Sequence, residues 1–271
     1  MKRFVLPFLL ITVLSSAHED LSDQIKIVTA KIKLNPRDPS LYFERAELFR
    51  GDSHWALAEK DYLYTRKLSP EMNAIDLGLG LLYYDTKRWK ESLQELSRFL
   101  KKKPDHVVAR ITRGRVLKIL GDFSGAIEDY SIALKIQPDP AVYIERARLL
   151  AAENKMEEAL TGLNEGISRL GSIVTMELYA IELEISLKRF GSALDRVDRI
   201  TAQSERKETW LVRRAEILHL AARDEEAKAA YAQALEEIEK LPESRKGTRY
   251  TRDLQKKIEL ALEGLATDPL Q

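Results

Sequence analysis

The residue types that carry catalysis or bind metals are sparse and scattered in this sequence. The four histidines stand apart, so no two lie three or four positions from each other on one helix face, and none belongs to a His-Glu-x-x-His zinc motif: His18, His54, His106 and His219. The 271 residues include no cysteine, which excludes disulfides, thiolate zinc sites and a lipid attached to cysteine. No serine lies in a Gly-x-Ser-x-Gly turn. We therefore expect no metal, no cofactor and no enzymatic activity.

Other patterns that sometimes mark binding chemistry have structural explanations here. Gly78-Leu-Gly80 lacks the further glycine and the lysine of a phosphate-binding loop, and it falls inside an expected helix. The carboxylate pairs Glu157-Glu158 and Glu225-Glu226 fall at expected helix starts, where negative charge is favoured by the helix dipole. The net charge is +1 and there is no basic tail or run, so we do not expect nucleic acid as a partner.

The elements that would position any binding residues are best seen in residues 107–138. This stretch predicts two short amphipathic helices that meet at Gly121-Asp122, and Pro138 closes the unit because a helix interior does not tolerate proline. The apolar positions of the two helices fall at helical spacing: Ile111, Val116, Leu117 and Leu120, then Ala126, Ile127, Tyr130, Ala133 and Leu134. Gly114 and Ala126 are small enough to let the two helices approach closely.

The same landmarks recur along the chain. Prolines follow one another at a constant interval of about 34 residues, at Pro36, Pro70, Pro104 and Pro138. A small residue opens each second helix at Ala58, Ser92, Ala126, Ala159, Ala193 and Ala227, and another lies in each first helix at Ala46, Gly80, Gly114, Ala147 and Ala215. The fifth unit fits only if its turn carries an extra residue, which would put Ala180 in the small position. Because two short helices cannot bury their apolar faces alone, neighbouring copies must complete the core.

With these residues the chain resembles the tetratricopeptide repeat (TPR) proteins, whose pattern is W-x2-L-G-x2-Y, A-x3-F and P within about 34 residues. Leu79-Gly80-x2-Tyr83 matches it, as does Ala126-x3-Tyr130, and the resemblance covers about residues 39–241. Arg110 and Arg113 depart from it, because the family usually has apolar residues there. The resemblance implies an all-α fold, a right-handed TPR α-solenoid of about six helical hairpins with an N-terminal half-unit and a C-terminal capping helix.

The chain divides into four expected segments. Residues 1–17, MKRFVLPFLLITVLSSA, combine a basic start, a short apolar run and small residues, which predicts a secretory signal peptide. Residues 18–35 predict an N-terminal cap helix, residues 36–247 the TPR array, and residues 248–271 a C-terminal capping helix and tail. The apolar face of that last helix comprises Leu254, Ile258, Ala261, Leu262 and Leu265. We expect no integral membrane span after signal cleavage.

The resemblance also implies where a partner binds. The first helices of TPR units line a concave groove that holds extended peptides or partner helices. By analogy the groove positions are Phe43, Leu77, Ile111, Ile144 and Val212, and four residues further on Glu47, Leu81, Arg115, Arg148 and Glu216. Arg115, Lys118 and Arg148 would form a basic centre, and Tyr84 a stacking surface. Either the centre binds a carboxylate or acidic segment, or its charges are solvated or paired with Glu145 and its neighbours.

Taken together, the sequence predicts an exported, non-catalytic scaffold that binds a protein or peptide partner in a bacterial cell-envelope assembly. The periplasm is the expected location, with extracellular or inner-membrane anchored protein as the alternatives. A membrane-tethered assembly subunit with an uncleaved N-terminal anchor is a second functional hypothesis, and an accessory subunit of an envelope enzyme is a third. The sequence identifies neither the partner nor the oligomeric state.

Overall fold

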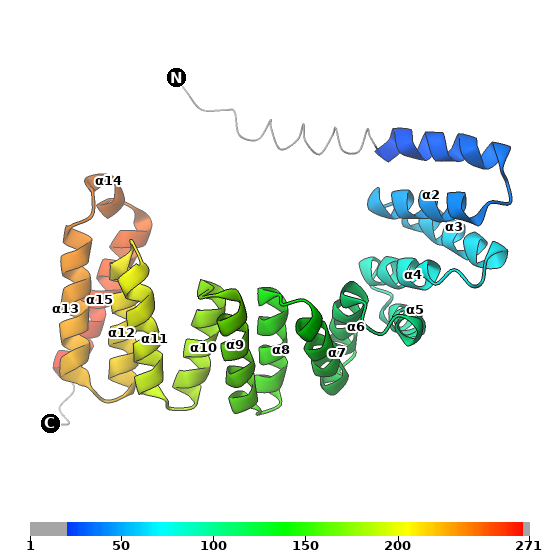
Figure 1. Cartoon of the computed structure of the whole chain (residues 1–271). Helices are drawn as coiled ribbons and strands as arrows, with labels where there is room; N and C mark the ends of the chain where they lie inside the picture. The colour runs from blue at the N-terminus through cyan, green and yellow to red at the C-terminus, as the bar shows by residue number, and fades with distance from the viewer. Residues whose placement is uncertain (1–20, 268–271) are drawn as a thin grey trace, which may run out of the picture. The chain divides into compact units, whose positions relative to one another are not determined.

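A computed structural model describes residues 21–267 of the chain, and this part consists of helices joined by turns (Figure 1). The predicted signal peptide, residues 1–17, lies outside the described residues, as does the start of the predicted N-terminal helix. The helices form two compact units that divide after Gln137. Within each unit, consecutive helices pack as hairpins, which is the architecture of a TPR α-solenoid and confirms the predicted fold class.

The first unit begins with a helix over residues 21–34, on which Val28 and Ile32 are buried. Three hairpins follow: α2 (Pro39–Gly51) with α3 (Trp55–Leu68), α4 (Ala74–Asp85) with α5 (Trp89–Lys102), and α6 (Val107–Ile119) with α7 (Phe123–Ile136). Side chains from successive hairpins share one core, as Tyr62 of α3 packs with Ile75 and Leu79 of α4. Each hairpin therefore buries its apolar face against the next, as the repeat pattern predicts.

The second unit has three more hairpins: α8 (Pro140–Ala152) with α9 (Met156–Leu170), α10 (Val174–Ser186) with α11 (Phe190–Gln203), and α12 (Lys207–Leu220) with α13 (Asp224–Glu239). A single helical turn, α14 (Glu243–Lys246), ends the predicted array, and α15 (Arg249–Thr267) follows. Leu254 and Ile258 of α15 are buried in the core that α11, α12 and α13 form, and the other predicted apolar residues of α15 pack against it.

Two first helices begin at an Asp-Pro pair. The Asp38 carboxylate accepts a hydrogen bond from the Ser40 amide, and the Asp139 carboxylate accepts one from the Ala141 amide. These bonds satisfy amides that the first helical turn leaves without a partner. Pro39 and Pro140 take the first helical position, where proline costs no hydrogen bond.

The turns inside the hairpins share one geometry. Three residues separate the two helices of every hairpin, and the middle one has φ between 56° and 86°: Ser53, Lys87, Gly121, Asn154, Lys188 and Ala222. The prediction that the fifth turn carries an extra residue is therefore wrong. In the other hairpins, the small residue of the first helix lies twelve positions before that of the second helix. In the fifth hairpin this position, twelve before Ala193, holds Ile181 and not Ala180, and Ile181 is fully buried. Turn geometry, rather than a small side chain, sets the register of this hairpin.

The close approach of first and second helices is visible at Gly114. A Cβ atom added there would lie 2.6 Å from Cε1 of Tyr130, so no side chain fits without displacement of the tyrosine ring. Ala126, the other small residue predicted at this contact, is fully buried. Among residues 21–267, no helix combines the length and apolar character needed to cross a bilayer.

Candidate functional site

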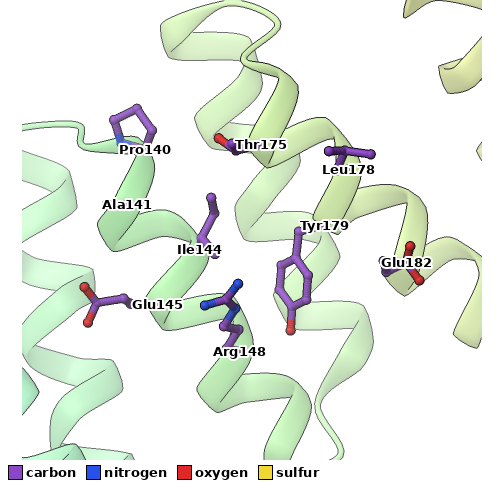
Figure 2. A pocket seen from close by; sticks show the side chains of 9 residues that line it. All are labelled: Pro140, Ala141, Ile144, Glu145, Arg148, Thr175, Leu178, Tyr179 and Glu182. Atoms are coloured by element: carbon purple, nitrogen blue, oxygen red, sulfur yellow. The ribbon is translucent and has the colours of Figure 1, made fainter. Parts of the chain in front are cut away.

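The first helices of two neighbouring hairpins, α8 and α10, border a hollow of about 700 Å³. Figure 2 shows its lining: Pro140, Ala141, Ile144, Glu145 and Arg148 from α8, and Thr175, Leu178, Tyr179 and Glu182 from α10. The floor is largely apolar, and charged groups lie at its margin. A hollow of this size and character suits an apolar side chain presented by a partner.

Helical spacing places these residues together. Ile144 and Arg148 lie one turn apart on α8, and Leu178 and Glu182 lie one turn apart on α10. Leu178 follows Ile144 by one repeat length, the interval that separates the recurring prolines, so the two occupy equivalent positions in consecutive repeats. Leu178 is 38% exposed, although leucine side chains are among those most often buried in folded proteins.

Charges around the hollow are arranged by specific contacts. The Arg148 guanidinium lies 5.6 Å from the centroid of the Tyr179 ring, as a cation–π pair. Burial raises the pKa of the Tyr179 phenol, and Arg148 acts in the opposite direction. Arg213 of α12 donates a hydrogen bond to the Glu182 carboxylate. The positive charge of Arg148 is thus held over an aromatic ring at the edge of an apolar floor.

Two of the predicted groove residues, Ile144 and Arg148, lie side by side in this hollow. The placement predicted for Val212 is wrong. Its side chain is only 3% exposed and belongs to the same apolar cluster as Leu254 and Ile258 of α15. The physical reason is that the C-terminal helix closes the core at this hairpin, and the groove analogy did not include it.

The predicted groove residues of the first unit lie on first helices and are all half-buried: Phe43, Leu77, Leu81, Tyr84, Ile111, Arg115 and Lys118. Phe43 packs against the core with its ring 5.8 Å from that of Tyr62, and Tyr84 contacts Trp89 edge-on at 5.7 Å. Arg115 and Lys118 both interact with other groups of the chain. Whether this surface binds a carboxylate stays a prediction.

Sequence reasoning missed the α10 side of the hollow. Leu178 and Glu182 lie one repeat length after Ile144 and Arg148, so strict continuation of the repeat would have found them. The assumption of an extra residue in the fifth turn hid that signal. Tyr179 lies one position further and gives no periodic signal of its own.

Metal chemistry has no support in this part of the chain. Within residues 21–267, no three His, Cys, Asp or Glu side chains are grouped as a metal site requires. The side chains around the hollow offer apolar contact, one cation at Arg148 and two carboxylates at Glu145 and Glu182. That arrangement is suited to binding.

Comparison with known proteins relates part of the chain to a repeat family. A family model described as tetratricopeptide repeat matches residues 43–107 and 111–169. No curated protein matches the chain. A crystal structure of a tetratricopeptide repeat protein from Parabacteroides merdae ATCC 43184 is 17% identical, with a TM-score of 0.53, and the match covers 89% of this chain and 93% of that one.

Two further solved structures share the fold. YrrB, described as a TPR protein with an unusual peptide-binding site, is 19% identical with a TM-score of 0.55, over 63% of this chain and 89% of YrrB. A MamA crystal structure is 14% identical with a TM-score of 0.52, over 63% of this chain and 94% of MamA. The helical hairpins within residues 43–107 and 111–169 match tetratricopeptide repeats, and the later hairpins share the fold of the solved TPR structures.

Proposed function

We propose that this chain is an exported, non-catalytic scaffold that binds a protein or peptide partner along its first helices, within a bacterial cell-envelope assembly. The TPR fold supports a role in protein interaction. The observation that carries the proposal is the apolar hollow between α8 and α10, floored by Ile144 and Leu178. YrrB, a structural neighbour, is described as having a peptide-binding site, which makes a peptide a reasonable occupant.

The geometry of the hollow suggests how the partner is held. An apolar side chain of the partner would enter between Ile144 and Leu178 and remove both from water. Arg148 would then meet an acidic group of the partner from its position over Tyr179. Because folded helices present the surface before binding, little conformational entropy of the scaffold is lost, which suits moderate and exchangeable affinity.

The groove is tested by a pull-down, in which the immobilised full chain is incubated with cell-envelope fractions and the retained proteins are identified. We expect Ile144→Asp/Leu178→Asp to reduce recovery of the specific partner at least tenfold, because it places two charges on the apolar floor. Leu220→Asp on α12, where the leucine is exposed outside the hollow, is the matched control and should retain the partner. Equal recovery by both variants would remove the hollow as the binding site.

The basic residues are tested separately. Charge reversal in Arg115→Glu/Arg148→Glu should weaken binding of an acidic partner and make the residual binding less sensitive to salt. Unchanged binding would mean that the groove recognises its partner through apolar contacts alone, and it would remove the acidic contact from the proposal.

Export is tested by the N-terminal mass of the protein recovered from the periplasm. The signal peptide predicted from residues 1–17 leads us to expect a chain that begins at His18. A chain that retains residues 1–17 and is recovered in the membrane fraction would favour the membrane-tethered assembly subunit instead.

A further inference from the structure

The outward face of α3 exposes more apolar surface than its place in the fold explains. We define the α3 outer face as Leu57, Lys60, Leu63, Tyr64 and Lys67, all of which are exposed. Its three large apolar side chains are between 38% and 45% exposed. Lys60, Tyr64 and Lys67 follow helical spacing and therefore lie along one stripe of the helix.

The repeat itself does not require these residues. In α5, the next second helix of the same unit, the positions equivalent to Leu57, Leu63 and Tyr64 hold Glu91, Ser97 and Arg98. Polar residues therefore serve at these positions of a second helix. The exposed apolar surface of α3 is therefore not a requirement of the hairpin fold.

The α3 outer face borders a hollow of about 470 Å³ that also includes Tyr42, Arg45 and Asp61. Tyr42 and Tyr64 meet edge-to-face, with ring centroids 4.6 Å apart, and form an aromatic wall. Asp61 is held by two hydrogen bonds from Arg45, at 2.6 and 2.9 Å, so its charge is already compensated.

The two lysines at the ends of the stripe carry positive charge that the described residues do not compensate. Within the described residues, neither Lys60 nor Lys67 makes an ion pair or a side-chain hydrogen bond. Lys67 lies seven positions after Lys60, which corresponds to about 10 Å along a helix. A peptide in the polyproline II conformation covers about 9 Å in three residues, and its three-residue turn brings the first and fourth side chains to the same side.

The geometry points to a docking site for an acidic peptide segment of a partner protein on the α3 outer face. The segment lies along α3 in the polyproline II conformation, with carboxylates three residues apart that reach Lys60 and Lys67. An apolar side chain between the carboxylates packs on Leu63 and the Tyr42–Tyr64 wall. This site lies on a second helix of the first unit and is separate from the first-helix hollow of the second unit.

The test is selection of random twelve-residue peptides from a phage library on the immobilised full chain, with synthesis of the enriched peptides for fluorescence anisotropy. We expect a class of peptides with two acidic residues three positions apart and an apolar residue between them. These should bind Lys60→Glu/Lys67→Glu at least tenfold more weakly. The control Lys90→Glu/Lys101→Glu makes the same charge change on α5, and binding to it should stay within twofold of that to the unmodified chain.

A second variant separates apolar from electrostatic recognition. Leu63→Ser/Tyr64→Arg installs the residues that α5 carries and is therefore compatible with the repeat. We expect loss of peptide binding despite the added positive charge. Binding kept or raised by this variant would refute the apolar contact.

Other occupants give different results, each of which overturns the proposal. A concentration-dependent dimer in sedimentation velocity that Lys60→Glu/Lys67→Glu abolishes would identify a second copy of the chain. Phosphatidylglycerol vesicles that retain the chain only when both lysines are present would identify a membrane surface. Enriched peptides without acidic residues, or no enriched peptide that discriminates the two lysine variants, would also refute the site.

Discussion

Arg113 of α6 holds the carboxylate of Asp129 on α7 through two parallel hydrogen bonds, from Nε to Oδ2 at 2.7 Å and from Nη2 to Oδ1 at 2.8 Å. Arg110 donates a third from Nη1 to Oδ1, at 2.7 Å. Asp129 is only 1% exposed, so these guanidinium groups replace most of the water that a carboxylate would otherwise bind. The two helices of this hairpin are therefore joined by charge as well as by apolar contact.

The same kind of contact recurs in other hairpins, once with the charges exchanged between the helices. Arg45 of α2 binds Asp61 of α3, at the same separation along the chain as Arg113 and Asp129. In the fifth hairpin the cation is on the second helix instead, where Arg196 of α11 binds Glu177 and Glu184 of α10. The hairpins thus tolerate either polarity at this contact, provided that the buried charges compensate each other.

Replacement of Asp129 by alanine should destabilise the protein by about 3–5 kcal/mol, because two arginines lose their buried counter-charge. The free energy of unfolding from guanidinium denaturation measures the effect. Glu128→Ala changes a neighbouring exposed acid on the same helix and should stay within about 0.5 kcal/mol of the unmodified chain. A loss no larger than that of Glu128→Ala would mean that the arginines find other partners.

Arg110 and Arg113 show what the sequence could and could not reveal. Periodicity predicts the hairpin and its apolar faces, because each depends on residues close together along one helix. The arginines stand out only as departures from the apolar pattern. Their explanation is a side-chain geometry between two helices, and the spacing of residues within one helix does not contain that information.

The candidate site was predictable to a similar extent. Ile144 and Arg148 follow from the repeat, and Leu178 and Glu182 were available from the same spacing. The small residue does not mark every first helix, because the buried Ile181 takes its place in α10 and obscures the register there. Tyr179 could not be predicted, because its role depends on how α8 and α10 pack.

Removal of the Arg196 cation alone and replacement of the whole charged cluster should have different effects on stability. Arg196→Met alone should cost about 3–5 kcal/mol, because Glu177 and Glu184 remain buried without their cation. The triple variant Arg196→Met/Glu177→Leu/Glu184→Leu should recover most of that loss, since apolar groups need no counter-charge. Denaturation of the single and triple variants at pH 7 measures both values. A triple variant less stable than the single one would show that the cluster contributes more than charge compensation.

Replacement of glycine by alanine should have opposite effects on stability at two positions. Gly114→Ala forces a Cβ atom to within 2.6 Å of the Tyr130 ring and should destabilise the protein by about 1–3 kcal/mol. Gly191 of α11 has no atom within 4 Å of an added Cβ, so Gly191→Ala should stabilise by about 0.4–1 kcal/mol through the unfolded chain. Thermal unfolding of the two variants gives the comparison, and a stabilising Gly114→Ala would contradict the close helix contact.

Tyr83 should make stability depend on alkaline pH. Burial, and then a hydrogen bond that its phenol donates to Glu59 at 2.8 Å, raise the pKa of Tyr83 to about 12. An unfolded tyrosine has a pKa of about 10 and loses its proton first, so unfolding becomes easier as pH rises from about 10 to about 12. The contribution of this one group is about 2–3 kcal/mol, present in full below pH 10 and lost by pH 12. Tyr83→Phe should therefore show a shallower fall in unfolding free energy over this range, and parallel curves for the two proteins would show that Tyr83 does not carry the effect.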